Sequence, residues 1–91
     1  MANNVQQSGT PINLTSSGVV SLAGGTLLGY HVNSTSAGTI VLRNGSTSAS
    51  AAITGTITPS VGFMPFCGSF PTGCYATIGG TLDVTFIFAA G

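Results

Sequence analysis

Ninety-one residues make one small domain, and charged side chains account for only 2% of it. Ordinary soluble domains carry roughly 25% charged residues, whereas this chain has one cation, Arg43, one anion, Asp83, and one histidine, His31. Nucleic-acid binding is excluded, because it depends on several Lys and Arg side chains that neutralise phosphates. No apolar stretch approaches the roughly 18 residues of a membrane-spanning helix. We therefore expect neither a nucleic-acid partner nor a membrane partner.

The first eleven residues, 1–11, are predicted to form an extended, polar N-terminal arm. Asn, Gln, Ser and Gly dominate this segment, and Val5 is its candidate interface residue. Such a segment is either a frayed terminus or one that orders only against a neighbouring protein. It lacks the cationic start and the apolar run of a signal peptide, which predicts synthesis in a cytoplasm.

Residues 12–91 are predicted to form a single all-β domain. Short apolar runs alternate with polar residues at a period of two, which is the pattern of strands with one buried face. No segment has the 3.6-residue period of a capped helix. The pattern predicts a β-sandwich or jelly roll of about seven or eight short antiparallel strands. The predicted strands include Val19–Leu22, Leu28–Val32, Ile40–Leu42, Ile53–Thr58, Gly62–Phe66, Cys74–Ile78 and Leu82–Phe88.

Glycine-rich pairs are predicted to form the turns between these strands. Gly24-Gly25, Asn44-Gly45 and Gly79-Gly80 can adopt the positive φ angles that tight hairpin turns require. Two longer segments, 33–38 and 46–51, read as low-complexity loops. In the predicted strand Leu28–Val32, the alternation places Leu28 on the buried face together with Tyr30 and Val32.

The predicted sheet has no lysine to protect its edges. Exposed edge strands pair with other chains unless charges or a covering element block them, and a net charge near zero removes the repulsion between monomers. We therefore expect identical partners to cover the edges in a closed oligomer.

Arg43 and Asp83 could form a salt bridge, either within the chain or across a subunit boundary; alternatively, both are exposed and never meet. Cys67 and Cys74 are separated by six residues, so a disulfide is possible if their Cα atoms lie within about 7 Å. Free thiols are favoured, because a cytoplasmic protein keeps cysteines reduced. We expect no metal or other cofactor, since a zinc site would need a closer cysteine spacing and a fourth ligand.

No enzymatic activity is expected. A catalytic triad can be written from a serine, His31 and Asp83, but the Gly-x-Ser-x-Gly elbow that would support it is missing. Phe63, Phe66 and Phe70 lie in a segment interrupted by proline. They are either core residues or part of a protein interface, where aromatic side chains are enriched.

Two segments of the C-terminal half resemble small virion proteins of tailed bacteriophages. They are ITGTITPSVGF at residues 53–63 and TGCYATIGGTLDVTF at residues 72–86, and the upstream block from Gly29 to Gly45 is similar to the same group. The resemblance covers about residues 17–88, although the two cysteines depart from the pattern. Proteins of this group include short β-sandwich trimers that decorate the outside of the capsid.

The resemblance implies a structural virion protein: a trimeric decoration, or cement, protein that stabilises the phage head. Its partners would be two further copies of itself and the major capsid protein, and it would lie on the capsid exterior. The alternative is a fibre-tip or receptor-binding module of the same fold, for which exposed aromatic side chains and glycan binding would be the signs. The resemblance carries no catalytic or metal-binding residue.

Overall fold

The computed structural model describes residues 9–90, apart from the side chains of Cys67 and Ala90. Within this range the chain forms six strands and no helix, which confirms the predicted all-β fold. All of the strands belong to one antiparallel sheet. The strands are β1 (Thr10–Leu14), β2 (Gly18–Ser21), β3 (Gly25–Asn44), β4 (Ala51–Ala52), β5 (Gly62–Phe70) and β6 (Cys74–Ala90).

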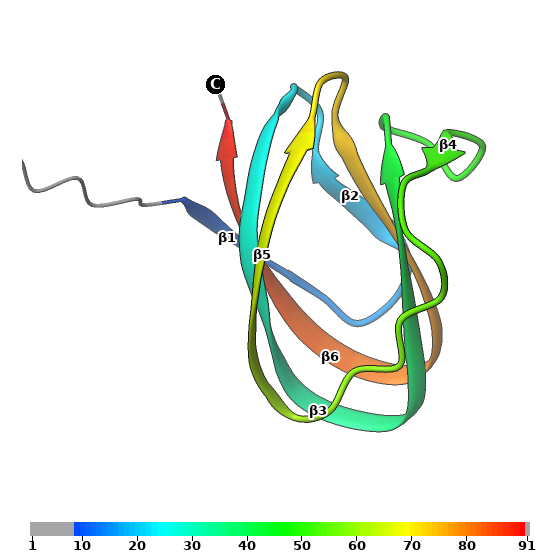
Figure 1. Cartoon of the computed structure of the whole chain (residues 1–91). Coiled ribbons are helices and arrows are strands. Elements are labelled where there is room, and N and C mark those ends of the chain that lie inside the picture. Colours follow the sequence, from blue (N-terminus) through cyan, green and yellow to red (C-terminus); the bar gives the residue numbers. More distant parts are fainter. Residues whose placement is uncertain (1–8, 91) are drawn as a thin grey trace, which may run out of the picture.

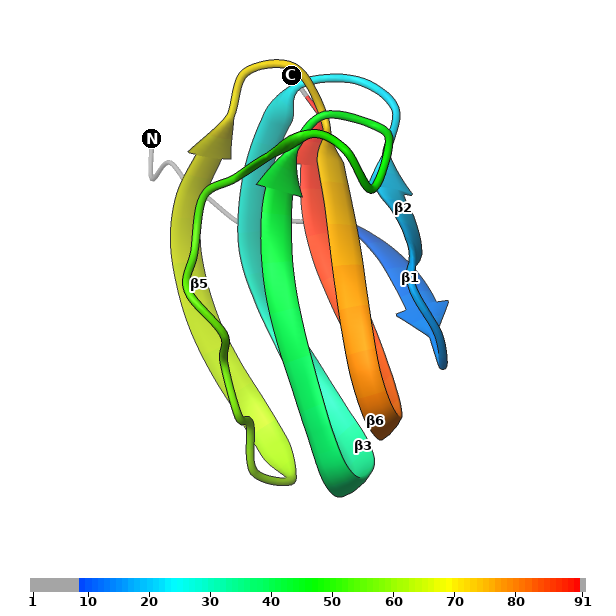
Figure 2. The ribbon, with the colours of Figure 1, turned by 90° about the vertical axis from the view of Figure 1, so that its right-hand side faces the viewer.

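Two long strands dominate the sheet. β3 and β6 pair with each other along almost their whole length, from Gly25 opposite Ala90 to Asn44 opposite Cys74. Both strands bend half-way, so that the sheet folds over and its two halves face each other (Figure 1 and Figure 2). The sequence predicts a β-sandwich. In the structure, one continuous sheet folds over and forms both of the facing layers.

The bend occurs where glycines of β6 lie opposite an irregular part of β3. The pairing register shifts between Ser36 and Thr39, and both Ala37 (φ 55°) and Gly80 (φ 68°) adopt left-handed backbone conformations. A side chain at Gly80 would collide with the Ala37 carbonyl. The predicted hairpin turn at Gly79-Gly80 is therefore wrong: the glycines bend a strand whose pairing continues on both sides.

The first layer consists of β5, residues 25–35 of β3, residues 81–90 of β6, and β1, in that order across the sheet. The second layer consists of β4, residues 39–44 of β3, residues 74–79 of β6, and β2. Thr10 and Pro11, which were predicted to belong to the arm, begin β1 instead. Of the predicted arm, residues 1–8, which include Val5, lie outside the described residues.

Fewer and longer strands form than the sequence predicts. The predicted loop at residues 33–38 is part of β3, which unites two predicted strands, and β6 unites two more. The predicted strand Ile53–Thr58 is not regular. An isolated bridge between Ile40 and Ile57 joins this segment to β3, with backbone hydrogen bonds of 2.9 and 2.8 Å. The amides of Ile53 and Thr54 also donate to the Leu42 carbonyl, at 2.8 and 3.4 Å.

The core lies between the two layers. It contains aliphatic and aromatic side chains from all of the larger strands, including the alternating set on β6 that the sequence predicts. Leu27 rather than Leu28 belongs to it, because a bulge between Leu27 and Gly29 inserts Leu28 as an extra residue. The buried side chains are Val20, Leu27, Tyr30, Val32, Ile40, Leu42, Phe70, Cys74, Ala76, Leu82, Val84, Phe86 and Phe88.

Candidate functional site

A polar cluster lies on the outer face of the first layer. Leu82, Val84 and Phe86 point into the core, so Asp83 and Thr85 between them face outward. The antiparallel register places Asn13 of β1 on one side of Thr85 and His31 of β3 on the other. A second bulge, between Val32 and Ser34, brings Asn33 into the same group.

Two asparagine amides hold Asp83 in this cluster. Asn13 donates from Nδ2 to Asp83 Oδ1 at 2.7 Å and to Thr85 Oγ1 at 3.1 Å. Asn33 donates from Nδ2 to the same two acceptors at 3.2 and 3.4 Å. The hydrogen bonds from Asn13 and, to a lesser extent, Asn33 lower the pKa of the Asp83 carboxyl group below its ordinary value.

The cluster joins the only histidine to the only side-chain carboxylate through an asparagine. Nδ1 of His31 lies 3.2 Å from Oδ1 of Asn33, whose amide nitrogen contacts Asp83. His31 and Asp83 were candidates from the sequence, and strand alternation places Thr85 on the same face as Asp83. The positions of Asn13 and Asn33 were not predicted, because they depend on a register and a bulge that alternation does not reveal.

An exposed aromatic ring lies next to this cluster. Phe63 of β5 is directly opposite His31 in the register and is 56% exposed. Its ring covers Gly29: a Cβ atom at that position would lie 2.6 Å from Phe63 Cζ. Glycine at position 29 therefore lets the ring rest on the outer face of the sheet.

The other two predicted interface phenylalanines are not freely exposed. Phe70 is completely buried, so it belongs to the core and the predicted interface role is wrong. Its ring packs on Phe66 and Phe88, with centroid separations of 6.3 and 6.1 Å. Phe66 is partly buried against the core. Phe63 alone of the three presents most of its side chain to the outside.

Arg43 lies on the outer face of the second layer. It follows the buried Leu42, and it donates from Nε to Thr77 Oγ1 at 2.9 Å and from Nη1 to the Ser50 carbonyl at 3.1 Å. Tyr75 lies directly opposite it on β6, and Val19 of β2 lies opposite Tyr75. Val19, Tyr75 and Arg43 are all partly exposed. Arg43 is the one charged residue of this row, so its guanidinium group lies on a largely uncharged surface.

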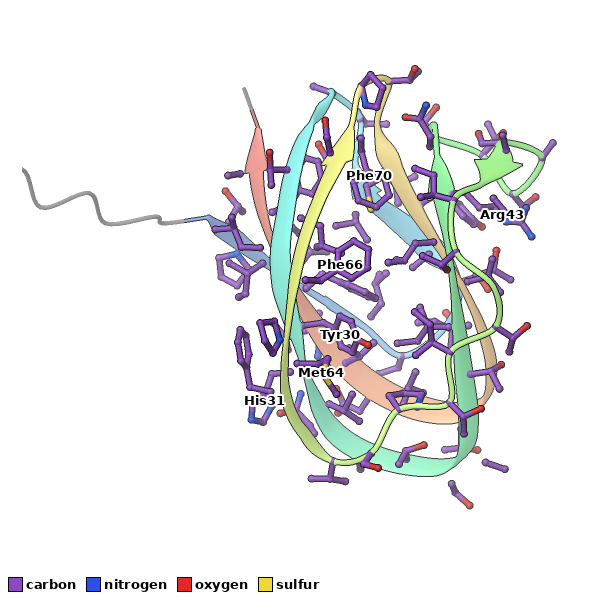
Figure 3. All side chains as sticks on the ribbon, viewed as in Figure 1. Tyr30, His31, Arg43, Met64, Phe66 and Phe70 are labelled. Atoms are coloured by element: carbon purple, nitrogen blue, oxygen red, sulfur yellow. The ribbon has the colours of Figure 1, made fainter. Side chains whose placement is uncertain are left out.

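The predicted salt bridge between Arg43 and Asp83 does not form within the chain. The two residues lie on opposite outer faces of the folded sheet, each with other hydrogen-bond partners. Figure 3 shows this separation: Arg43 lies at one side of the molecule, and His31, which is joined to Asp83 through Asn33, lies at the other.

Cys74 is a free thiol in the core. Burial raises its pKa to about 12, so the reactive thiolate form is rare at neutral pH. The free thiol of Cys74 agrees with the favoured of the two alternatives, and Cys74 does not form the alternative disulfide with Cys67. The side chain of Cys67 lies outside the described part of the chain.

A shallow hollow of about 190 Å³ opens between β1, β2 and the end of β6. Its walls are Thr10, Ile12, Val20, Ser21 and Phe88, none of which titrates. Among the described residues, no three His, Cys, Asp or Glu side chains are close enough to hold a metal ion. The same part of the chain has no helix with the length and apolarity to cross a membrane.

Comparisons with protein-family models, with curated proteins and with solved structures found no match. The two outer faces therefore have to be interpreted from their own chemistry. One presents Asp83 among amide, hydroxyl and imidazole groups beside an exposed ring, and the other presents Arg43 among partly exposed apolar and aromatic side chains.

Proposed function

We propose that this protein is a structural component of a phage virion: a trimeric decoration protein that binds the major capsid protein on the outside of the head. The observation that carries the proposal is a nearly uncharged sheet surface with open edges. The resemblance of residues 17–88 to small phage virion proteins supports the same function. The role is one of binding and stabilisation, without catalysis.

Apolar side chains remain exposed at several places on this surface. Five large hydrophobic side chains are between 47% and 77% exposed: Leu22, Ile53, Val61, Phe63 and Met64. The last three are in or next to β5, which pairs only with β3 among the described strands. Phe63 and Met64 lie on opposite faces of this edge strand, and exposed apolar side chains along an edge favour contact with another protein.

The open edges of the sheet also favour assembly, because their backbone groups can pair with another chain. β1 and β2 each pair only with β6, so within the described residues their outer backbone groups have no strand partner. Pro65 in β5 lacks a backbone donor, which partly protects that edge. β1 and β2 contain no charged side chain that would repel another strand.

A capsid lattice suits a protein with this surface. Each copy of a trimer would present the same contacts, and simultaneous attachment multiplies modest affinities through effective concentration. Charge contributes little, because one cation and one anion per chain cannot supply strong Coulomb attraction. Host synthesis followed by attachment to the capsid exterior is the corresponding localisation.

Decoration can be tested with purified capsids that lack this protein. The purified protein should bind them at regular sites visible by electron microscopy, and it should raise the temperature at which the heads disrupt. Binding should persist at roughly molar salt. The Debye length at that concentration is about 3 Å, so attraction between exposed charges is screened whereas apolar contacts are not. Undecorated capsids after incubation, with the protein still folded by circular dichroism, would contradict the proposal.

A receptor-binding role is the second candidate, and Phe63 is the observation that favours it. Sugars combine hydroxyl groups, which pair with carboxylates and amides, with apolar ring faces, which pack on aromatic rings. Asp83, Asn33 and Phe63 share one outer face, although Phe63 lies on a strand rather than at a loop tip. Binding to immobilised host glycans, lost in a Phe63→Ala variant, would support this role.

A further inference from the structure

We infer that copies of this chain associate head to tail, with the outer face around Asp83 of one copy packed against the outer face around Arg43 of the next. This inference rests on the trimer of the proposed function and names the surfaces that join its subunits. It uses the two charged side chains of the chain, Asp83 on the outer face of the first layer and Arg43 on the outer face of the second.

Charge complementarity selects a second copy as the occupant. Burying an unpaired charge in an interface is unfavourable unless an opposite charge is supplied. Asp83 and Arg43 do not meet within one chain, and no other side chain carries a formal charge at neutral pH when His31 is neutral. In an assembly of identical chains, the available side-chain partner for Asp83 is therefore Arg43 of a neighbour.

Each group has an unused position for such a contact. The hydrogen bonds to Asp83 within the described residues end on Oδ1, which leaves Oδ2 available. Arg43 uses Nε and Nη1, which leaves Nη2 available. The existing hydrogen bonds also fix both side chains, so less conformational entropy is lost when they pair across an interface.

The surroundings of both charges can be buried together. Phe63, His31 and Thr85 lie in one row across the first layer. Val19, Tyr75 and Arg43 lie in one row across the second. Apart from the one charge on each face, these rows present aromatic, apolar and hydroxyl groups, which resembles the composition of an interface core.

The placement of the charges also determines the symmetry. A twofold interface uses the same patch on both subunits, but Asp83 and Arg43 lie on opposite faces and cannot belong to one patch. The contact is therefore heterologous, and such contacts close into rings or continue as filaments. A ring of three is the closed form that agrees with the proposed decoration protein.

Charge reversal tests the contact directly. Asp83→Arg and Arg43→Asp each place like charges together, and each should raise the dissociation concentration of the assembly by at least about tenfold. The double variant Asp83→Arg/Arg43→Asp restores opposite charges and should assemble nearly as well as the original protein. Sedimentation and light scattering over a range of concentrations measure this. Circular dichroism and melting curves establish that every variant is folded, and Ser16→Asp, at an exposed turn, is the matched control.

An equimolar mixture of the two single variants sharpens the test. Alternating copies present opposite charges at every contact, so the mixture should assemble better than either variant alone. An alternating ring of three always contains one mismatched contact, and the mixture should therefore form fewer closed trimers than the double variant.

The inference is overturned if the original protein is a monomer, if the single variants assemble normally, or if the double variant is as weak as they are. Filaments in place of rings would overturn the closed assembly. Loss of glycan binding in Asp83→Arg with normal assembly would assign the face to a receptor instead. Decoration is measured separately, by binding to capsids. A trimer whose assembly is unchanged by charge reversal contradicts the inferred contact but not the proposed function. A trimer whose assembly depends on these charges but which does not bind capsids contradicts the proposed function alone.

Discussion

The inner and outer faces of the first layer are formed by the same strands but differ in chemistry, one apolar and the other polar. On β6, Leu82, Val84 and Phe86 are buried against the second layer, whereas Asp83 and Thr85 between them form the outer polar cluster. The inner face holds the two layers together through apolar burial, which tolerates exchanges between apolar side chains of similar volume. The outer face is organised by directed hydrogen bonds around one carboxylate. Adjacent residues of one strand thus contribute alternately to the core and to the polar outer cluster.

The largest expected effect breaks the inner face. Phe86→Ala removes a completely buried ring that packs 5.9 Å from Tyr30 between centroids. The free energy of unfolding should fall by about 3–5 kcal/mol. Phe63→Ala is the matched control on the outer face and should change it by no more than about 0.5 kcal/mol. Chemical denaturation of both variants measures the contrast, and equal losses would mean that Phe63 is also a core residue.

The second prediction concerns two neighbouring leucines at the bulge. Leu27→Ala should reduce the free energy of unfolding by about 2–5 kcal/mol, because Leu27 is fully buried. Leu28→Ala should have a clearly smaller effect, since Leu28 is only partly buried. Denaturant titrations of the two variants under identical conditions compare them. A larger loss for Leu28→Ala would contradict the bulge.

The third prediction concerns the bend that creates the two faces. Gly80→Ala introduces a side chain at a positive φ angle and against the Ala37 carbonyl. It should destabilise the fold by about 1–3 kcal/mol. Gly55→Ala is the control, because a Cβ atom there has nothing within 4 Å. If thermal unfolding shows the same small change for both, the bend does not depend on Gly80.

The smallest expected effect concerns the outer face and pH. Because the pKa of Asp83 is lowered in the folded state, its ionised carboxylate stabilises the fold at pH values above 3.8, the ordinary pKa. This contribution is lost as the pH falls through the folded-state pKa. Asn13→Ala removes the strongest of the lowering hydrogen bonds and should raise the Asp83 pKa toward 3.8. Carboxyl NMR titration is simple here, since the chain has one acidic side chain.

His31 is the other titratable group facing this cluster, through Asn33. An unchanged Asp83 pKa in Asn13→Ala would show that the amide does not stabilise the carboxylate.

The all-β class and most of the inner face could be predicted from the sequence. Alternation identifies Ile40, Leu42 and the buried residues of β6 because a strand places every second side chain on one face. It fails where an extra residue interrupts the period, as at Leu28, and where glycines bend a strand without reversing it, as at Gly79-Gly80. Both failures reflect pairing between distant segments, which local patterns do not contain.

The candidate site was less predictable for the same reason. Arg43 and Asp83 were conspicuous as the only charges, but their separation depends on the bend, and Phe70 was indistinguishable from Phe63 by composition. Asn13 and Asp83 are seventy residues apart, and their contact exists only because β1 pairs with the end of β6.

The central position of β6 also determines when the chain can fold during synthesis. Strands β1, β2 and β3 all pair with β6, which follows the other five described strands in the chain and is synthesised after them. Before then, β3 has only β4 and β5 as partners, and β1 and β2 have none within the described sheet. The native sheet can therefore form only after β6 has emerged, and until then the earlier strands, which carry no lysine, lack their main pairing partner.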